Sequence, residues 1–139
     1  MQQDTRLARL LHVLIHMQLR GGSTTSDTIA QMLRTNPALV RRTMASLRNA
    51  GYVQSERGPG GGWQLCCSLS DVTVKDVYIA LSQPTVFAFG PAADNPACPV
   101  EAAVNAHLKT ALEAAESVLL KTMGKTTLAD LVKKIATPP

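Results

Sequence analysis

The sequence has 139 residues, of which 45% are apolar and 17% charged, and it carries a net charge of +4. This composition excludes a disordered chain, and the length supports one domain with an appendage that needs no disulfides or metals. No apolar run approaches the ~20 residues that cross a bilayer, and the first ten residues do not resemble a secretory signal. With an odd count of three cysteines, these features predict a protein of the reducing cytoplasm that has no membrane partner.

The charges are unevenly distributed along the chain. Residues 1–67 contain eight arginines, no lysine and three acids, whereas residues 68–139 contain six lysines, no arginine and seven acids. Arginine suits bidentate contacts with phosphate or guanine, and scattered lysine mainly increases solubility. The asymmetry predicts a basic binding region followed by a region with another task.

Three helices are expected in the first fifty residues. A broad apolar stripe predicts a helix over residues 4–20, and a short helix follows through residues 29–33 after several residues that favour N-caps. A third helix is expected over residues 37–50, with Asn36 as its N-cap and a proline in its first turn. Glycines follow the first and the third helix and end them.

A hairpin and a fourth helix come next. Short alternating segments at residues 52–56 and 63–67 predict two strands, joined by the glycine-rich loop 58–62. A Thr-x-x-Asp capping box at Thr73 begins a helix that Pro84 ends. Three helices followed by such a hairpin are the sequence signature of a winged helix-turn-helix.

The longest helical pattern covers residues 99–123, after a proline-rich loop. Its apolar residues recur at alternating steps of four and three, which is typical of a helix–helix interface. The seam and its neighbours are Val104, Leu108, Ala111, Leu112, Ala115, Val118 and Leu119. A winged helix is too small to cover such a seam alone, so the pattern predicts a symmetric homodimer. A second capping box, at Thr127, begins a last helix over residues 128–135.

These elements predict a mainly α fold, a winged helix-turn-helix with a two-stranded β-wing and a long C-terminal dimerisation helix. The DNA-binding domain is expected over residues 1–83, a linker loop over 84–98, and the dimerisation helix with the short last helix over 99–139. The function expected of this architecture is sequence-specific binding of double-stranded DNA by a transcriptional regulator.

The third helix is expected to read the DNA. At 100° per residue, Val40, Met44 and Leu47 fall within about 60° of one another and pack inward, while small residues and arginines face outward. A face of this kind alone also fits a solvated helix, but the capped helix before it and the hairpin after it favour DNA. The residues expected at the DNA, here and at the wing, are Thr25, Asn36, Pro37, Ala38, Arg41, Arg42, Ala45, Arg48, Arg57, Gly58, Gly60 and Gly61.

The wing loop offers a second contact. Arg57 stands beside a backbone that has almost no side chains, so the loop can approach phosphates closely and place this arginine in a minor groove. The alternative is a flexible turn with no ligand. The loop lacks the Lys-Ser/Thr ending of a nucleotide-binding phosphate loop.

Several segments resemble a known family. NPALVRR at 36–42, LRNAGYV at 47–53 and SERGPGGG at 55–62 are similar to the Rrf2 family, bacterial winged-helix transcription regulators that are mostly repressors. VTVKDVY at 72–78 and TTLADL at 126–131 resemble the next helix and the C-terminal end of that family. The resemblance implies a homodimer formed through the long helix, with operator DNA as its ligand.

The cysteines depart from the family pattern. The best-known members hold an iron–sulfur cluster on three cysteines before the long helix, but here only Cys98 lies in that region, which resembles the cluster-free branch and predicts no cofactor. Cys98 precedes a helix N-terminus, which lowers the pKa of a thiol, so it is either a sensor thiol or a half-buried residue at the end of a loop. Cys66 and Cys67 are expected to fill the core or the sheet edge.

Other readings of the sequence are weaker. His12 and His16 have a spacing that suits a metal on a helix, but no third ligand is near, so they are expected to be structural. Cys98 and His107 are separated by ~13 Å of helix and do not form a catalytic pair, so no enzyme is expected. The rival function is a winged helix that meets an acidic protein and binds DNA only weakly and without specificity.

Overall fold

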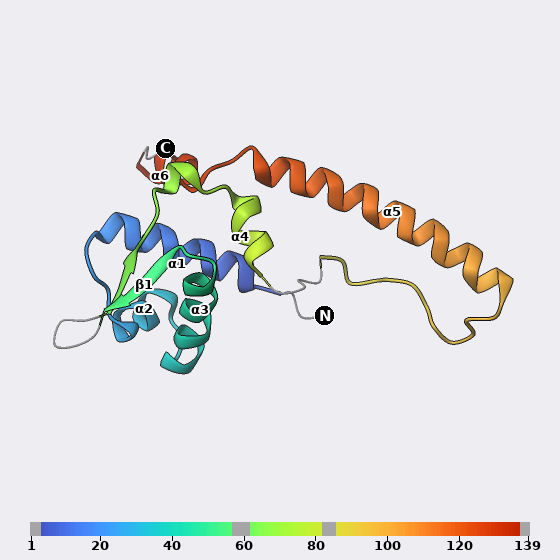
Figure 1. Cartoon of the computed structure of the whole chain (residues 1–139), viewed down its shortest axis with the longest axis horizontal. Helices are drawn as coiled ribbons and strands as arrows, with labels where there is room; N and C mark the ends of the chain where they lie inside the picture. The colour runs from blue at the N-terminus through green and yellow to red at the C-terminus, as the bar shows by residue number, and fades with distance from the viewer. Residues whose placement is uncertain (1–3, 57–61, 82–85, 137–139) are drawn as a thin grey trace.

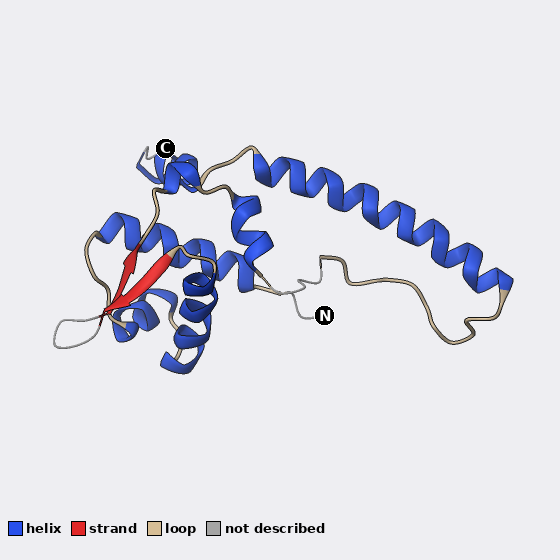
Figure 2. Cartoon of the chain, in the orientation of Figure 1, coloured by secondary structure: helices blue, strands red, loops and turns tan. Residues whose placement is uncertain are grey.

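The computed structural model describes residues 4–56, 62–81 and 86–136. Helices dominate these segments, and the two strands form one antiparallel sheet (Figures 1 and 2). The predicted mainly α fold with a two-stranded hairpin is confirmed. In chain order the elements are α1 (Arg6–Arg20), α2 (Ser26–Leu33), α3 (Pro37–Asn49), β1 (Val53–Glu56), β2 (Gly62–Leu65), the 3-10 helix η1 (Leu69–Asp71), α4 (Val74–Ala80), α5 (Pro99–Gly124) and α6 (Leu128–Ala136).

One aliphatic core joins α1, α2, α3, the hairpin, α4 and α6. The apolar stripe of α1 contributes Leu10, Val13, Leu14 and Met17, all of them buried, so the helix lies centrally in the domain as its sequence predicts. Burying one leucine side chain stabilises the fold by about 1.5–3 kcal/mol. A core built from many such side chains holds the three helices and the hairpin in fixed positions.

The hairpin is shorter than expected at its second strand. β1 pairs with β2 from Val53 opposite Leu65 to Glu56 opposite Gly62. The return strand was expected to reach Cys67, but it ends at Leu65, since the chain turns there toward η1. The 3-10 helix itself was not predicted, and its three residues are too few to produce a periodic pattern.

The capping boxes form where the sequence places them. The hydroxyl of Thr73 accepts a hydrogen bond from the amide of Asp76 (3.1 Å), and the Asp76 carboxylate accepts one from the amide of Thr73 (2.9 Å). The same reciprocal pair joins Thr127 and Asp130 at the start of α6, with distances of 2.9 and 3.1 Å. Pro84, expected to end the fourth helix, lies outside the described residues.

α5 extends away from the other helices, and the loop before it runs out beside it to its far end (Figure 1). Asn105 fixes this loop through two hydrogen bonds with Ala92. The Asn105 side chain accepts one from the amide of Ala92 (3.0 Å) and donates one to the carbonyl of Ala92 (2.8 Å). Glu101 accepts a third bond from the amide of Asn95 (2.7 Å). None of the described helices combines the length and the apolar character that crossing a bilayer requires.

After α5 the chain returns to the first domain. Thr127 forms an isolated β-bridge with Thr73, and the amide of Leu128 donates a hydrogen bond to the carbonyl of Val72 (2.9 Å). Leu128 is fully buried, and α6 packs against α1 and η1. The division into 1–83, 84–98 and 99–139 remains a prediction, and the packing shows that residues 128–136 lie against the first of these segments.

Candidate nucleic-acid interface

The turn between α2 and α3 is held by local hydrogen bonds. The Thr25 hydroxyl accepts a bond from the amide of Thr28 (3.1 Å) and caps α2, and the Asn36 side chain accepts one from the amide of Leu39 (2.9 Å) and caps α3. Between them Arg34 adopts a left-handed backbone conformation, with φ of 53°. These contacts fix α3 against α2, so that α3 is presented as a rigid element.

α3 has one buried and one exposed face. Val40, Met44 and Leu47 are fully buried, as predicted, and Thr43 joins them with its hydroxyl bonded to the carbonyl of Leu39 (2.9 Å). Most residues expected at the DNA lie on the exposed face, while Ala45 is half-buried at its edge. The exposed members are Asn36, Pro37, Ala38, Arg41, Arg42 and Arg48, and Thr25 is exposed at the start of α2.

All charged residues on the exposed face of α3 are basic. The helix contains no aspartate or glutamate. None of Arg41, Arg42 and Arg48 forms an ion pair with a described residue. Guanidinium groups that are free of internal partners are available to phosphates and guanine edges, and they attract a polyanion over distance. The surface therefore has the chemistry of a DNA-binding helix.

The wing begins directly after the last strand pair, Glu56 opposite Gly62. Its predicted contact residues, Arg57, Gly58, Gly60 and Gly61, lie outside the described residues, and their role stays a prediction.

The base of the hairpin is tied to the start of α2. The indole nitrogen of Trp63 donates a hydrogen bond to the hydroxyl of Ser26 (3.1 Å), and Thr24 and Trp63 exchange two backbone bonds of 2.9 and 2.8 Å. A Cβ atom at Gly62 would lie 2.5 Å from the carbonyl oxygen of Thr24. This junction was not predicted from the sequence, in which the one tryptophan, placed beside a glycine, is the available signal.

α5 exposes the seam predicted for the dimer. No residue of the helix is buried, and Val104 and Val118 are 52% and 66% exposed. Along the rest of the seam Ala111 and Ala115 are exposed and the three leucines, Leu108, Leu112 and Leu119, are half-buried. The described part of the chain thus leaves a long apolar helix face in contact with solvent.

The comparison with known families decides the identity of this arrangement. The model described as Rrf2, iron-dependent transcriptional regulator, matches residues 3–134. The chain belongs to the Rrf2 family. It is therefore a DNA-binding transcriptional regulator and not an enzyme, and the resemblance found in the sequence is confirmed.

Individual relatives agree with this assignment. YwnA of Bacillus subtilis strain 168, named as an HTH-type transcriptional regulator, is 28% identical to this Rrf2 chain over 133 residues, which are 95% of this chain and 98% of YwnA. A structure described as a transcriptional regulator from Lactobacillus plantarum is 23% identical, with a TM-score of 0.80 over 96% of this chain and 91% of that one. The structure of CymR, the global cysteine regulator of B. subtilis, is 23% identical, with a TM-score of 0.66 over 96% of this chain and 98% of CymR. The two structures share the fold of this chain.

The iron in the Rrf2 description does not fit the residues present. Among the residues that the structure describes, no three histidine, cysteine or acidic side chains gather into a metal-binding group. Cys66 and Cys67 follow the wing strand β2, whereas Cys98 precedes α5. Because an iron–sulfur cluster requires several thiolates at one place, this member lacks the donor set for one.

The three thiols have different surroundings. Cys98 is half-buried at the N-cap position of α5, and the amides of Glu101 and Val100 lower the pKa of its thiol. Burial raises the pKa of the Cys67 thiol, which packs against the core beside the carbonyl of Tyr52 (3.7 Å). Cys98 therefore has more thiolate character than Cys67.

Proposed function

We propose that this Rrf2 protein is a sequence-specific repressor that binds operator DNA as a homodimer in the cytoplasm. The observation that carries the proposal is the outward face of α3, which presents three arginines without acidic partners beside small side chains. Occupancy of an operator close to a promoter then blocks transcription.

The N-terminal half of α3 is the part that reads bases. Small residues such as Ala38 let the helix approach the floor of the major groove, while Arg41 and Arg42 reach guanine edges or phosphates. Arg48, in the last turn of α3, contacts the sugar–phosphate backbone of the DNA. Arg57 at the wing enters the neighbouring minor groove, and the glycines around it permit the close approach.

The exposed apolar seam of α5 supports the homodimer. Two copies of this helix that pack side by side cover Val104, Leu108 and Val118 of both chains and remove the seam from water. Such a dimer presents two α3 helices to the DNA, and half-sites one turn of the duplex apart, ~34 Å, in a palindromic operator are the spacing that we expect it to bind.

A thiol response at Cys98 is the form of regulation that the geometry favours. The lowered pKa gives a reactive thiolate, and a peroxide oxidises a thiolate to a sulfenic acid. The modified group sits at the start of the dimer helix, where added bulk tilts the two DNA-binding domains and releases the operator. The CymR structure, described as that of a cysteine regulator, belongs to a protein of the same fold.

Selection of bound sequences from random duplex DNA tests the proposal. We expect the full chain to enrich one palindromic motif. Arg42→Ala is expected to change the preferred bases and to cost about 1–3 kcal/mol of binding free energy, as a base-reading arginine does. The matched control is Arg20→Ala in the last turn of α1, which is expected to leave the motif unchanged. Enrichment of no motif, together with binding of an acidic protein, would support the rival protein-interaction function.

A further inference from the structure

A basic cavity lies between the start of α1 and the flank of α3. Its volume is about 220 Å³, and its lining includes three arginines, Arg6 and Arg9 from α1 and Arg42 from α3. Leu10 and Leu39 supply apolar parts of its wall. Neither Arg6 nor Arg9 was predicted to belong to a site, because nothing in the sequence shows that α1 begins beside α3.

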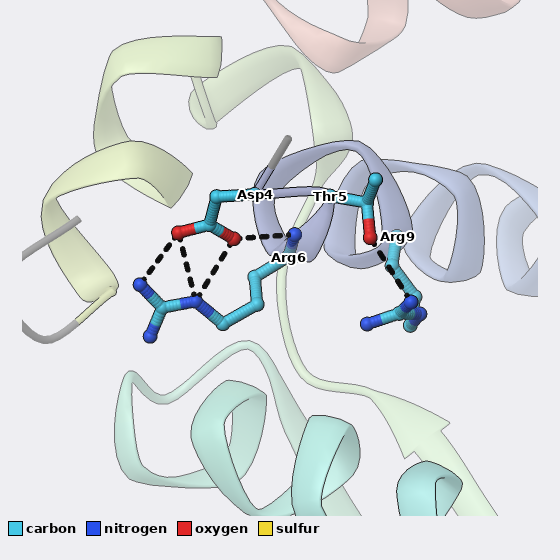
Figure 3. A network of polar contacts seen from close by, with 4 residues as sticks. All are labelled: Asp4, Thr5, Arg6 and Arg9. Carbon is cyan, nitrogen blue, oxygen red and sulfur yellow. Dashed lines mark hydrogen bonds and ion pairs between the residues drawn. The ribbon is translucent and has the colours of Figure 1, made fainter. Parts of the chain in front are cut away.

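Both α1 arginines are held in fixed positions by the residues before them (Figure 3). Asp4 accepts hydrogen bonds from Nε (3.0 Å) and Nη2 (2.7 Å) of Arg6, while Nη1 points away from the carboxylate. The guanidinium of Arg9 donates to the hydroxyl of Thr5 (3.1 Å). Side chains that are already ordered lose less conformational entropy when a ligand binds.

The cavity carries an excess of positive charge. Three guanidinium groups line it and no carboxylate of the described residues does, while Asp4 beside it pairs with Arg6, which lowers the pKa of this carboxylate to about 2, so that it stays ionised. The planar fork of a guanidinium matches two oxygens of a phosphate. The ligand that this chemistry suits is a phosphate group.

We propose that the cavity binds a backbone phosphate of the operator, at the edge of the major groove that α3 occupies. The inference rests on the proposed function: Arg42 lies at the side of the cavity next to the exposed face of α3, where we propose that it reads bases, and Arg6 and Arg9 are the residues that we assign to the phosphate. A helix in the major groove has a sugar–phosphate strand along each flank. The flank of α3 that faces α1 therefore brings one strand past Arg6 and Arg9.

The salt dependence of DNA binding tests this proposal. The full chain and the variants Arg6→Gln and Arg9→Gln are titrated with the selected duplex at several salt concentrations. Each lost phosphate contact reduces the slope of log K against log[salt] by about 0.9, so a dimer with two altered cavities loses about 1.8. Arg20→Gln on the same helix is the matched control and keeps the wild-type slope. A slope in Arg6→Gln and Arg9→Gln equal to that of the control would overturn the assignment to DNA.

Asp4→Asn gives a result in the opposite direction. The asparagine oxygen still accepts a bond from Arg6, but the compensating charge is gone, so the affinity for the duplex should rise. Unchanged or weaker binding would show that Arg6 does not face a phosphate of the DNA.

A second measurement separates DNA from a free ligand and stays informative if the proposed function fails. Inorganic phosphate is added to the full chain, and the Nε–H signals of Arg6 and Arg9 are followed by NMR. If the wild type binds no duplex, or the slopes do not change, a shift of these signals assigns the cavity to a free phosphate instead of the operator. No shift combined with unchanged slopes overturns the site altogether.

Discussion

Replacing Gly62 by alanine is expected to separate the hairpin from the start of α2. The new Cβ would lie 2.5 Å from the carbonyl oxygen of Thr24 and 2.8 Å from its carbon. Both are backbone atoms, which cannot rotate away, so the strand must shift and the two backbone bonds between Thr24 and Trp63 are strained or lost. Overpacking and two weakened hydrogen bonds together lower the free energy of unfolding by about 1–3 kcal/mol.

Urea unfolding of the full chain measures this loss, and Gly90→Ala is the matched control. A Cβ at Gly90 meets no atom within 4 Å. That variant is expected to be neutral or to gain about 0.4–1 kcal/mol, because alanine restricts the unfolded chain. Gly62→Ala should also weaken DNA binding, since the wing moves relative to α3. Equal stability and equal DNA affinity for the two variants would refute the reasoning about the hairpin junction.

Three further predictions follow from the described contacts. Leu108→Glu places a charge in the exposed seam of α5 and should give monomers that have lost tight DNA binding; a monomeric wild type in sedimentation at micromolar concentration would contradict this. In a variant without the other two thiols, the lowered pKa of Cys98 leaves more thiolate at neutral pH, so its alkylation rate should rise at a pH below the ~8.5 of a free thiol; a rise at or above that pH would leave Cys98 a packing residue. Leu128→Ala should lower the free energy of unfolding by about 2–5 kcal/mol, whereas Ile135→Ala on the exposed side of the same helix should change it little, and similar losses for both would contradict the docking of α6.

The parts of the fold that depend on local signals could be predicted from the sequence. The caps at Asn36, Thr73 and Thr127 form because each needs only a side chain and an amide three residues later. The inward face of α3 followed in the same way from helical periodicity. The end of β2 at Leu65 was missed, since it depends on where the chain turns toward η1.

The features that join distant segments could not be predicted. The cavity lined by Arg6, Arg9 and Arg42 exists because α1 packs across α3, and no spacing in the sequence expresses that contact. The burial of Leu128 depends on α1, more than a hundred residues earlier. The wing contacts at 57–61 remain a prediction, as do the dimer seam and the sensor thiol.

The docking of α6 also bears on the order of events during synthesis. The core that begins with α1 is completed by residues 128–136, which are translated after the whole of α5. At about 5–20 residues per second, roughly 3–10 s separate the end of α4 from the end of α6. During that interval α5 is translated first, and the nascent DNA-binding domain lacks Leu128 until α5 is complete. The DNA-binding domain therefore completes its core only after the helix that we propose for dimerisation has been made, so the two parts of the chain mature together at the end of synthesis.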